Sequence, residues 1–224
     1  MDELTHLPQI TIELLGIHLV INTNTVIMTW IVMGALIVFG FLATRRIGRI
    51  PNPFQVVGEL FANAFWGLTK DALDEDMARK YFPLICILFM FLLLCNWLGT
   101  FPHLEEPTKD LNTPLGLGIM GFVIAHYSGI RAKGFVSYAK EYFEPIFFMM
   151  PLNLIGEIAK VVSISFRLYG NIMGGAIIVL VVSHLVYSLI LPPFLIAFFN
   201  LFIGTIQAFV FTMLTLVYIS VQVK

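Results

Sequence analysis

The sequence predicts an all-α membrane protein with five membrane-spanning helices, and three observations support this. Hydrophobic residues make up 58% of the 224-residue chain, and the mean hydropathy is +0.90. Only 12% of the residues are charged, about half the share of a typical soluble domain. The apolar residues also gather in long runs that could cross a bilayer. We expect residues 1–224 to form a single membrane domain.

Five apolar runs mark the expected spans. The first has about 20 uncharged residues, which as a helix cover roughly 30 Å, the thickness of the hydrocarbon core. The fourth is too long for one upright helix, so we expect it to be tilted or bent, with Pro192 and Pro193 ending it. Together with the fifth run it should form a long tilted hairpin. The expected spans are residues 25–44, 81–101, 113–130, 145–190 and 194–223.

One further helix is expected to lie on the membrane surface rather than cross it. Residues 53–70 carry apolar side chains at helical spacing, which is typical of an interfacial amphipathic helix. These are Phe54, Val57, Leu60, Phe61, Ala64, Phe65 and Leu68. Residues 135–144 suggest a second, shorter interfacial segment.

The basic residues predict how the chain is oriented. Lys and Arg concentrate in loops 45–80 and 131–144, whereas the opposite side has only Lys109 set among acidic residues. Because basic loops stay in the cytoplasm, we expect the N-terminus outside and the C-terminus inside. The N-terminal segment has no basic residue before Arg45, so we do not expect it to be a secretory signal.

Several classes of partner are not expected. The net charge of −1 gives no sign of nucleic-acid binding, and the sequence contains no glycine-rich nucleotide loop. Cys86 and Cys95 lie in one apolar run, where packing is a commoner role than a disulfide or a metal site. We therefore expect no metal, cofactor or nucleotide in this chain, and lipid as its main surroundings.

Arg167 is the residue that needs an explanation. From Leu168 to Val223 the sequence has no Asp, Glu, Lys or Arg, and apolar or neutral residues also precede Arg167. An arginine inside a bilayer costs at least ~2.5–3.5 kcal/mol and cannot deprotonate. It must face water, a carboxylate or both. The alternative is that it snorkels to the headgroups or pairs with Glu157, about 15 Å away along a helix.

Helical spacing places Arg167 on a polar and small-residue stripe. Counting by threes and fours gives Glu157, Lys160, Ile164, Arg167, Asn171 and Gly174. Gly170, Gly174 and Gly175 should let another backbone approach, so we expect the partner carboxylate to come from another subunit. The last run has a similar stripe that contains Asn200, Gly204 and Gln207. Gln207 either bridges two helices, or orients Arg167 and lines a water path.

Four segments resemble subunit a of bacterial F-type ATP synthases. SISFRLYGNIMGG (163–175) resembles the family's Arg-Leu-(Phe or Tyr)-Gly-Asn signature, and IQAFVFTMLTLVYIS (206–220) its last helix. EPTKDLNTPL (106–115) and PLNLIGEIAK (151–160) resemble the segments before its third span and at the start of its long tilted helix. The matches occur in the family's order along the chain.

The resemblance implies a rotary mechanism. The last two spans would pack against a ring of c subunits, each with one ion-binding carboxylate, and peripheral-stalk b subunits would hold the chain as a stator. Two offset aqueous half-channels would load and unload the ring, coupling proton or Na⁺ flow to ATP synthesis. The chain would be no enzyme by itself, and it would lie in the bacterial inner membrane.

The resemblance also assigns roles residue by residue. Arg167 matches the essential arginine between the half-channels, Asn171 the polar position one turn later, and Gln207 the glutamine of the last helix. Glu157 and Lys160 are expected along the cytoplasmic path. His184 is expected in the outer part of the fourth span, where it either relays protons or lies near the headgroups.

Two positions depart from the family pattern. Many members have an ionisable residue shortly after the Gly-Asn pair and an ionisable or polar counterpart on the last helix, where this chain has Ala176 and Asn200. A water-filled path could suffice, His184 could substitute, or the coupling ion could be Na⁺. We expect protons, the commoner case.

Two other classes of function compete with this interpretation. A stand-alone secondary transporter or channel would predict inverted repeats or paired broken helices, which the sequence does not show. A purely structural membrane anchor would have no need of Arg167 within an apolar stretch.

Overall fold

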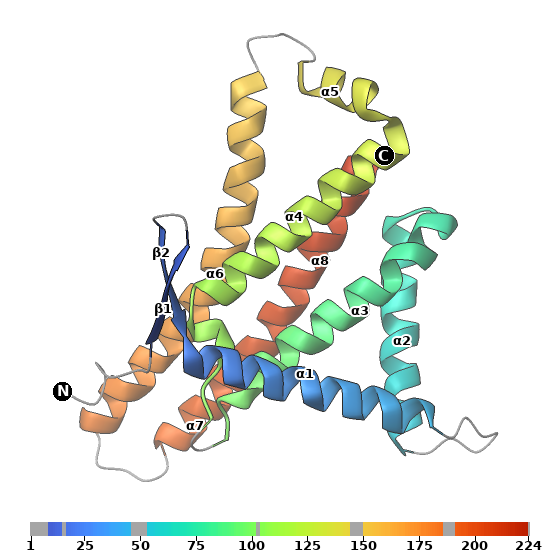
Figure 1. Ribbon diagram of the computed structural model, residues 1–224. Coiled ribbons are helices and arrows are strands. Elements are labelled where there is room, and N and C mark those ends of the chain that lie inside the picture. The colour runs from blue at the N-terminus through green and yellow to red at the C-terminus, as the bar shows by residue number, and fades with distance from the viewer. Residues whose placement is uncertain are drawn as a thin grey trace.

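The computed structural model is a bundle of long helices with a short β-hairpin beside it (Figure 1). The structure describes residues 9–14, 17–45, 53–101, 104–143, 150–185 and 191–223. Within these ranges, five helical segments are long and apolar enough to cross a membrane, as the sequence predicts. They are Thr23–Thr44, Glu75–Leu98, Asn112–Lys133, Met150–Leu185 and Leu191–Val223.

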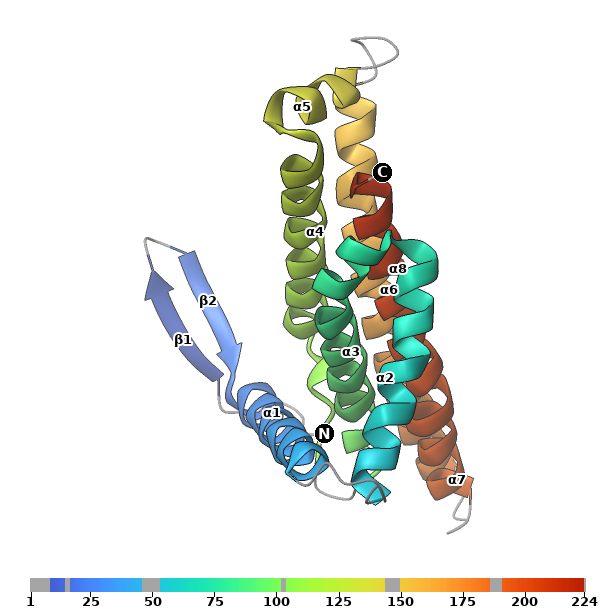
Figure 2. The same cartoon turned by 90° about the vertical axis from the view of Figure 1, so that its right-hand side faces the viewer.

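The first two helices run in different directions. Helix α1 (Thr23–Thr44) crosses in front of the bundle, and α2 (Pro53–Ala72) turns away from it to lie beside α3 (Glu75–Leu98) (Figures 1 and 2). Helix α2 covers the predicted amphipathic range. Its buried side chain Phe65 packs on Phe89 of α3 with ring centroids 4.7 Å apart, while Leu60 faces outward. A separate helix therefore forms where the spacing predicts it, with apolar side chains packed against α3 on one side and exposed on the other.

A two-stranded hairpin precedes α1 and was not predicted. Strands β1 (Gln9–Leu14) and β2 (Ile17–Asn22) pair antiparallel, with Gln9 opposite Asn22 and Leu14 opposite Ile17. The sequence signal was present as two runs rich in β-branched residues around Gly16. The prediction of an all-α protein rested on the high mean hydropathy of the whole chain and did not take these two short runs into account.

The remaining helices complete the bundle. Helix α4 (Asn112–Lys133) leads through the positive-φ residue Gly134 into the short α5 (Phe135–Phe143). The long α6 (Met150–Leu185) follows, and the chain returns through α7 (Leu191–Ala197), the π-helix Phe198–Ile203 and α8 (Gly204–Val223). The core lies between α2, α3, α4, α6 and α8. Helix α8 is the central element. It buries nine residues among α3, α4 and α6, and Phe211, Leu216 and Ile219 on it are fully buried.

A long helix, α6, is followed by a returning helical segment from α7 to α8, as expected for the hairpin. The fourth span was expected over residues 145–190, but 144–149 and 186–190 lie outside the described residues. Pro192 and Pro193 lie in the first turn of α7, where proline is tolerated because no helical donor is lost.

Glycines on α4 bring the helices close together, as expected for a membrane bundle. A Cβ at Gly121 would lie 3.2 Å from Thr215 of α8, and one at Gly129 would lie 2.8 Å from the backbone of Gln222. Gly118 faces α6 in the same way, against Ser165. Small residues therefore set how tightly α4 packs on the hairpin.

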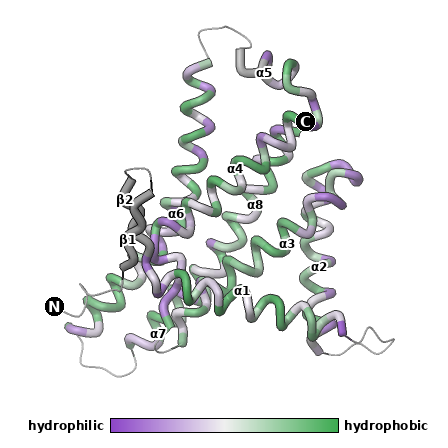
Figure 3. The backbone as a smooth tube through the Cα atoms, viewed as in Figure 1, coloured by the Kyte–Doolittle hydropathy of each residue, from purple (hydrophilic) through white to green (hydrophobic). Residues whose placement is uncertain are grey.

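The outer surface is largely apolar. Hydrophobic residues follow α1, α3 and α8 along most of their length, and hydrophilic ones gather at the turn between α2 and α3 and on parts of α6 (Figure 3). Trp30 and Ile37 of α1 are among many large apolar side chains on the outside. This is the pattern of a helix bundle whose solvent is lipid.

Candidate ion-translocation site

Arg167 lies in the middle of α6 with its side chain exposed. One turn on, Gly170 and then Gly174 leave open space, since a Cβ at either position would meet nothing within 4 Å. Gly175 differs, because a Cβ there would lie 2.8 Å from the ring of Phe199. The shallow face beside Arg167 is thus made by Gly170 and Gly174, and Gly175 serves the contact within the chain.

Glu157 does not pair with Arg167. Its Oε1 lies 2.6 Å from Nζ of Lys160, one turn further along α6, and Lys160 also lies over the ring of Tyr218. In the described part of the chain no acidic side chain comes within ion-pair distance of Arg167. The alternative explanation, an ion pair inside this chain, is therefore not supported by the described residues.

Asn171 and Gln207 join the two helices of the long hairpin. Nδ2 of Asn171 donates a 2.8 Å hydrogen bond to Oε1 of Gln207, which is buried in α8. Gln207 therefore does bridge helices, one of its two predicted roles. Its Nε2 is buried without a hydrogen-bond partner among the described residues. Since a buried donor is normally satisfied, this nitrogen is available to a water molecule or to a group outside the chain.

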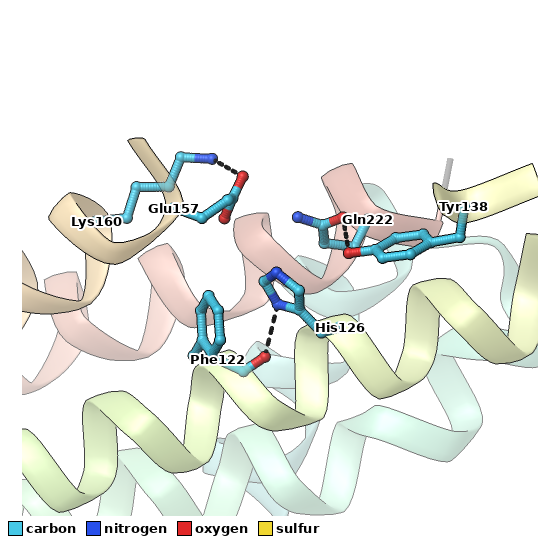
Figure 4. A network of polar contacts seen from close by, with 6 residues as sticks. All are labelled: Phe122, His126, Tyr138, Glu157, Lys160 and Gln222. Carbon is cyan, nitrogen blue, oxygen red and sulfur yellow. Dashed lines mark hydrogen bonds and ion pairs between the residues drawn. The ribbon is translucent and has the colours of Figure 1, made fainter. Parts of the chain in front are cut away.

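One end of α6 borders a mainly apolar cavity of about 180 Å³ that contains a few polar side chains, with a second cavity of about 350 Å³ beside it. Glu157, Lys160 and Gln222 line both, and His126 of α4 faces the first (Figure 4). Nδ1 of His126 lies 3.0 Å from the Phe122 carbonyl oxygen. The hydroxyl of Tyr138 donates a 2.8 Å bond to Gln222. We call the two neighbouring cavities together the α5-end cavity.

Sequence analysis missed His126 and Tyr138. The signal for His126 was a histidine inside the apolar run 113–130, which has no Asp, Glu, Lys or Arg. Tyr138 carried no signal, because its contact with Gln222 joins segments 84 residues apart.

A larger cavity of about 880 Å³ lies toward the other end of α6. Its walls come from the start of α1, from the 105–112 segment and from α6. The α6 wall runs from Tyr169 through Met173 and Ala176 to Leu180, and the facing wall contains Glu105, Glu106, Lys109 and Asp110. We call it the α1-end cavity. Arg167 lies two residues before its α6 wall and seven after Lys160.

Asn200 is hydrogen-bonded to Glu106, a residue in the wall of the α1-end cavity. It is buried in the π-helix, and its Nδ2 donates a 2.7 Å hydrogen bond to Oε1 of Glu106. Oε2 of Glu106 lies 2.5 Å from Nζ of Lys109. Sequence analysis missed Glu106, although it begins a segment used for the family resemblance.

His184 does not join either group. It is exposed near the end of α6, its Nδ1 lies 3.0 Å from the Leu180 carbonyl oxygen, and it is not in the wall of either cavity. Both of its predicted roles, proton relay and a position near the headgroups, stay predictions. In the described residues, no three His, Cys, Asp or Glu side chains are grouped as metal ligands.

Comparisons with known proteins decide the family. The family model described as "ATP synthase A chain" matches residues 26–220. The chain belongs to the ATP synthase subunit a family. Relatives named ATP synthase subunit a include the Moorella thermoacetica protein, 38% identical over 88% of this chain and 89% of its own. The Campylobacter jejuni protein is 36% identical over 82% of this chain and 83% of its own.

Membership confirms the resemblance drawn from the motifs. The match begins inside α1 and ends near the end of α8, so it includes at least part of each of the five long helical segments. This chain is therefore a membrane component of an ATP synthase, with roles in ATP synthesis and ion transport.

Proposed function

We propose that this chain is the ion-translocating stator subunit, which loads and unloads ions on a rotating ring through two half-channels separated by Arg167. The observation that carries the proposal is the position of Arg167. It is an exposed, permanently charged side chain on a shallow face of α6, between cavities that lie toward opposite ends of that helix.

The shallow face supports a partner helix at Arg167. Gly156, Gly170 and Gly174 each leave open space for an approaching backbone. A ring of c subunits, each with a carboxylate at this depth, would supply the opposite charge that the described part of the chain does not. The guanidinium would favour the ionised carboxylate and repel a cation moving directly from one cavity to the other.

The two cavities are the natural candidates for the half-channels. We assign the α5-end cavity, with Glu157 and Lys160, to the cytoplasmic path, because the basic residues Arg131 and Lys133 end α4 on that side. The α1-end cavity is then the outer path, with the N-terminus outside and the C-terminus inside. Peripheral-stalk b subunits would hold the chain in the bacterial inner membrane, and α2 would lie along its cytoplasmic surface.

Protons are the proposed coupling ion. The described wall of the α1-end cavity contains carboxylates and a tyrosine, which can exchange protons with water. Na⁺ dependence of pumping by the reconstituted complex tests this part separately.

The deciding experiment replaces Arg167 in the complete ATP synthase. R167A and R167K are expected to abolish ATP-driven ion pumping in reconstituted vesicles, while ATP hydrolysis by the detached catalytic head stays normal. R131A is the matched control, because Arg131 is an exposed arginine in the last turn of α4. It should pump at close to the unmodified rate.

The result that would overturn the proposal is equally clear. Near-normal pumping by R167A would show that Arg167 does not separate the two paths. Ion transport by this chain purified without the ring would instead favour a stand-alone transporter.

A further inference from the structure

We propose that Glu106 is the proton-accepting group of the outer path, a role for which Ala176 and Asn200 offer no ionisable side chain. This inference rests on the proposed function, because it takes the α1-end cavity to be the path by which protons reach the ring.

The carboxylate of Glu106 is buried. The Glu106 side chain is only 2% exposed, and burying an unpaired carboxylate is costly. Two contacts make the position tolerable: Nδ2 of Asn200 donates a 2.7 Å hydrogen bond to Oε1, and the Lys109 ammonium forms an ion pair with Oε2 at 2.5 Å. Oε2 has no hydrogen-bond partner among the described residues, so the carboxylate is held by one hydrogen bond from the hairpin and one ion pair from its own loop.

The surrounding backbone makes room for this carboxylate. A Cβ at Gly99 would overlap the Glu106 carboxyl group, so the absence of a side chain at Gly99 creates the space. On the other side, the hydroxyl of buried Thr108 donates to Oδ1 of Asn96, whose Nδ2 donates to the Gly204 carbonyl oxygen. The loop that carries Glu106 is thus fixed to both α3 and α8.

Glu106 also lies in a cavity wall. It lines the α1-end cavity opposite the α6 wall that contains Tyr169 and Ala176. That wall begins two residues, about 3 Å of helix rise, after Arg167, so cavity water reaches the depth of the arginine, although Tyr169 points to the other side of α6. Lys109 is 35% exposed and can move toward the cavity when Glu106 is neutral.

The proposed step is a reversible proton transfer through water. A hydronium ion in the cavity transfers its proton to Oε2 and becomes a water molecule. The transfer forms an O–H bond on Oε2, and because the carboxyl group is then neutral, its ion pair with Lys109 is lost. The carboxyl group then returns that proton to a cavity water on the Arg167 side, and the ion pair with Lys109 forms again. The other ionisable groups on the cavity wall are Glu105, Asp110 and Tyr169.

The test is E106Q in the complete ATP synthase, with E75Q as the matched control. Glutamine keeps the size of the side chain and can still accept from Asn200, but it does not take up a proton. Glu75 is an exposed glutamate in the first turn of α3 and lines none of the cavities described above. E106Q should reduce ATP-driven proton pumping on the order of a hundredfold, the scale of a lost acid–base group, and E75Q should leave the rate within about twofold.

A second variant separates proton transfer from a structural role. E106Q/A176E moves the carboxylate to the facing wall of the same cavity, and it should restore a substantial part of the pumping rate. A carboxylate that only clamps the loop to Asn200 would not be replaced from α6. If E106Q fails to assemble with the ring, E106Q/K109Q removes the unpaired lysine and is measured in the same way.

The outcomes distinguish this inference from the proposed function. If R167A abolishes pumping while E106Q pumps normally, the proposed function stands and the role of Glu106 is overturned. Loss of pumping in E106Q with no recovery in E106Q/A176E would also overturn it, because Glu106 would then be a structural clamp.

Discussion

Asn171 on α6 and Gln207 on α8 are joined by a 2.8 Å hydrogen bond, one turn beyond Arg167. This bond fixes the two arms of the long hairpin to each other at the level where the cavities approach the arginine. The bond also uses only one of the two polar ends of Gln207, since its Nε2 has no partner among the described residues.

The Asn171–Gln207 bond should be measurable as a coupling energy. We expect a double-mutant cycle with N171A and Q207A to give about 0.6 kcal/mol, the average for hydrogen bonds between membrane helices. Unfolding of the purified subunit in detergent measures the cycle. Q207L should lose more pumping than N171A, because it also removes the unpartnered donor. Equal losses would show that Nε2 plays no separate part.

The ion pair between Glu157 and Lys160 should tolerate exchange of its partners. E157K/K160E keeps opposite charges one turn apart, so it should assemble better than either single substitution. Because Lys160 is 41% exposed, water screens the pair and we expect a gain of no more than about 1 kcal/mol over the single variants. The recovery of intact complex after purification is the measurement. A double variant as poor as E157K alone would contradict the pairing.

Two adjacent glycines should fail in different ways when replaced by valine. G175V places a side chain against Phe199, and overpacking of this kind costs about 1–3 kcal/mol. G174V meets open space within the chain, so the isolated subunit should keep its stability while ring contact and pumping are lost. Thermal unfolding of the subunit and pumping by the complex test both. Similar unfolding temperatures for the two variants would contradict this assignment of faces.

Replacing Asn96 should be among the most damaging changes away from Arg167. This fully buried amide donates to the Gly204 carbonyl oxygen and accepts from Thr108. N96L leaves both groups unsatisfied, at about 1–3 kcal/mol for each. W97F is the neighbouring control, because it removes only an exposed bond to Thr205. Unfolding in detergent should rank N96L well below W97F.

Hydropathy and charge were sufficient to predict the long helices and Arg167. Apolar runs of the right length can satisfy their backbone in lipid only as helices, so length and composition define the spans. Arg167 was identified because a permanent charge in such a run is costly whatever the surrounding fold. Neither argument required knowledge of how the helices pack.

Contacts between distant segments could not be predicted in this way. Glu106 and Asn200 are 94 residues apart, and nothing in either local sequence indicates the other. The stripe predicted through Asn200, Gly204 and Gln207 assumed a regular α-helix, but the π-helix Phe198–Ile203 changes the angular spacing there. As a result Asn200 contacts the 105–112 segment, Gly204 faces Asn96, and Gln207 reaches α6.

Helix α1 buries little of its surface, and Val32 is its one fully buried residue in the structure as described. Most substitutions of one apolar residue by another on α1 therefore change only what touches lipid. Over evolutionary time its residue identities should be free to drift so long as their hydropathy is kept. In α8, where nine residues are buried against neighbouring helices, shape as well as hydropathy restricts each position. A saturation mutagenesis scan would record this as broad tolerance in α1 and narrow tolerance in α8.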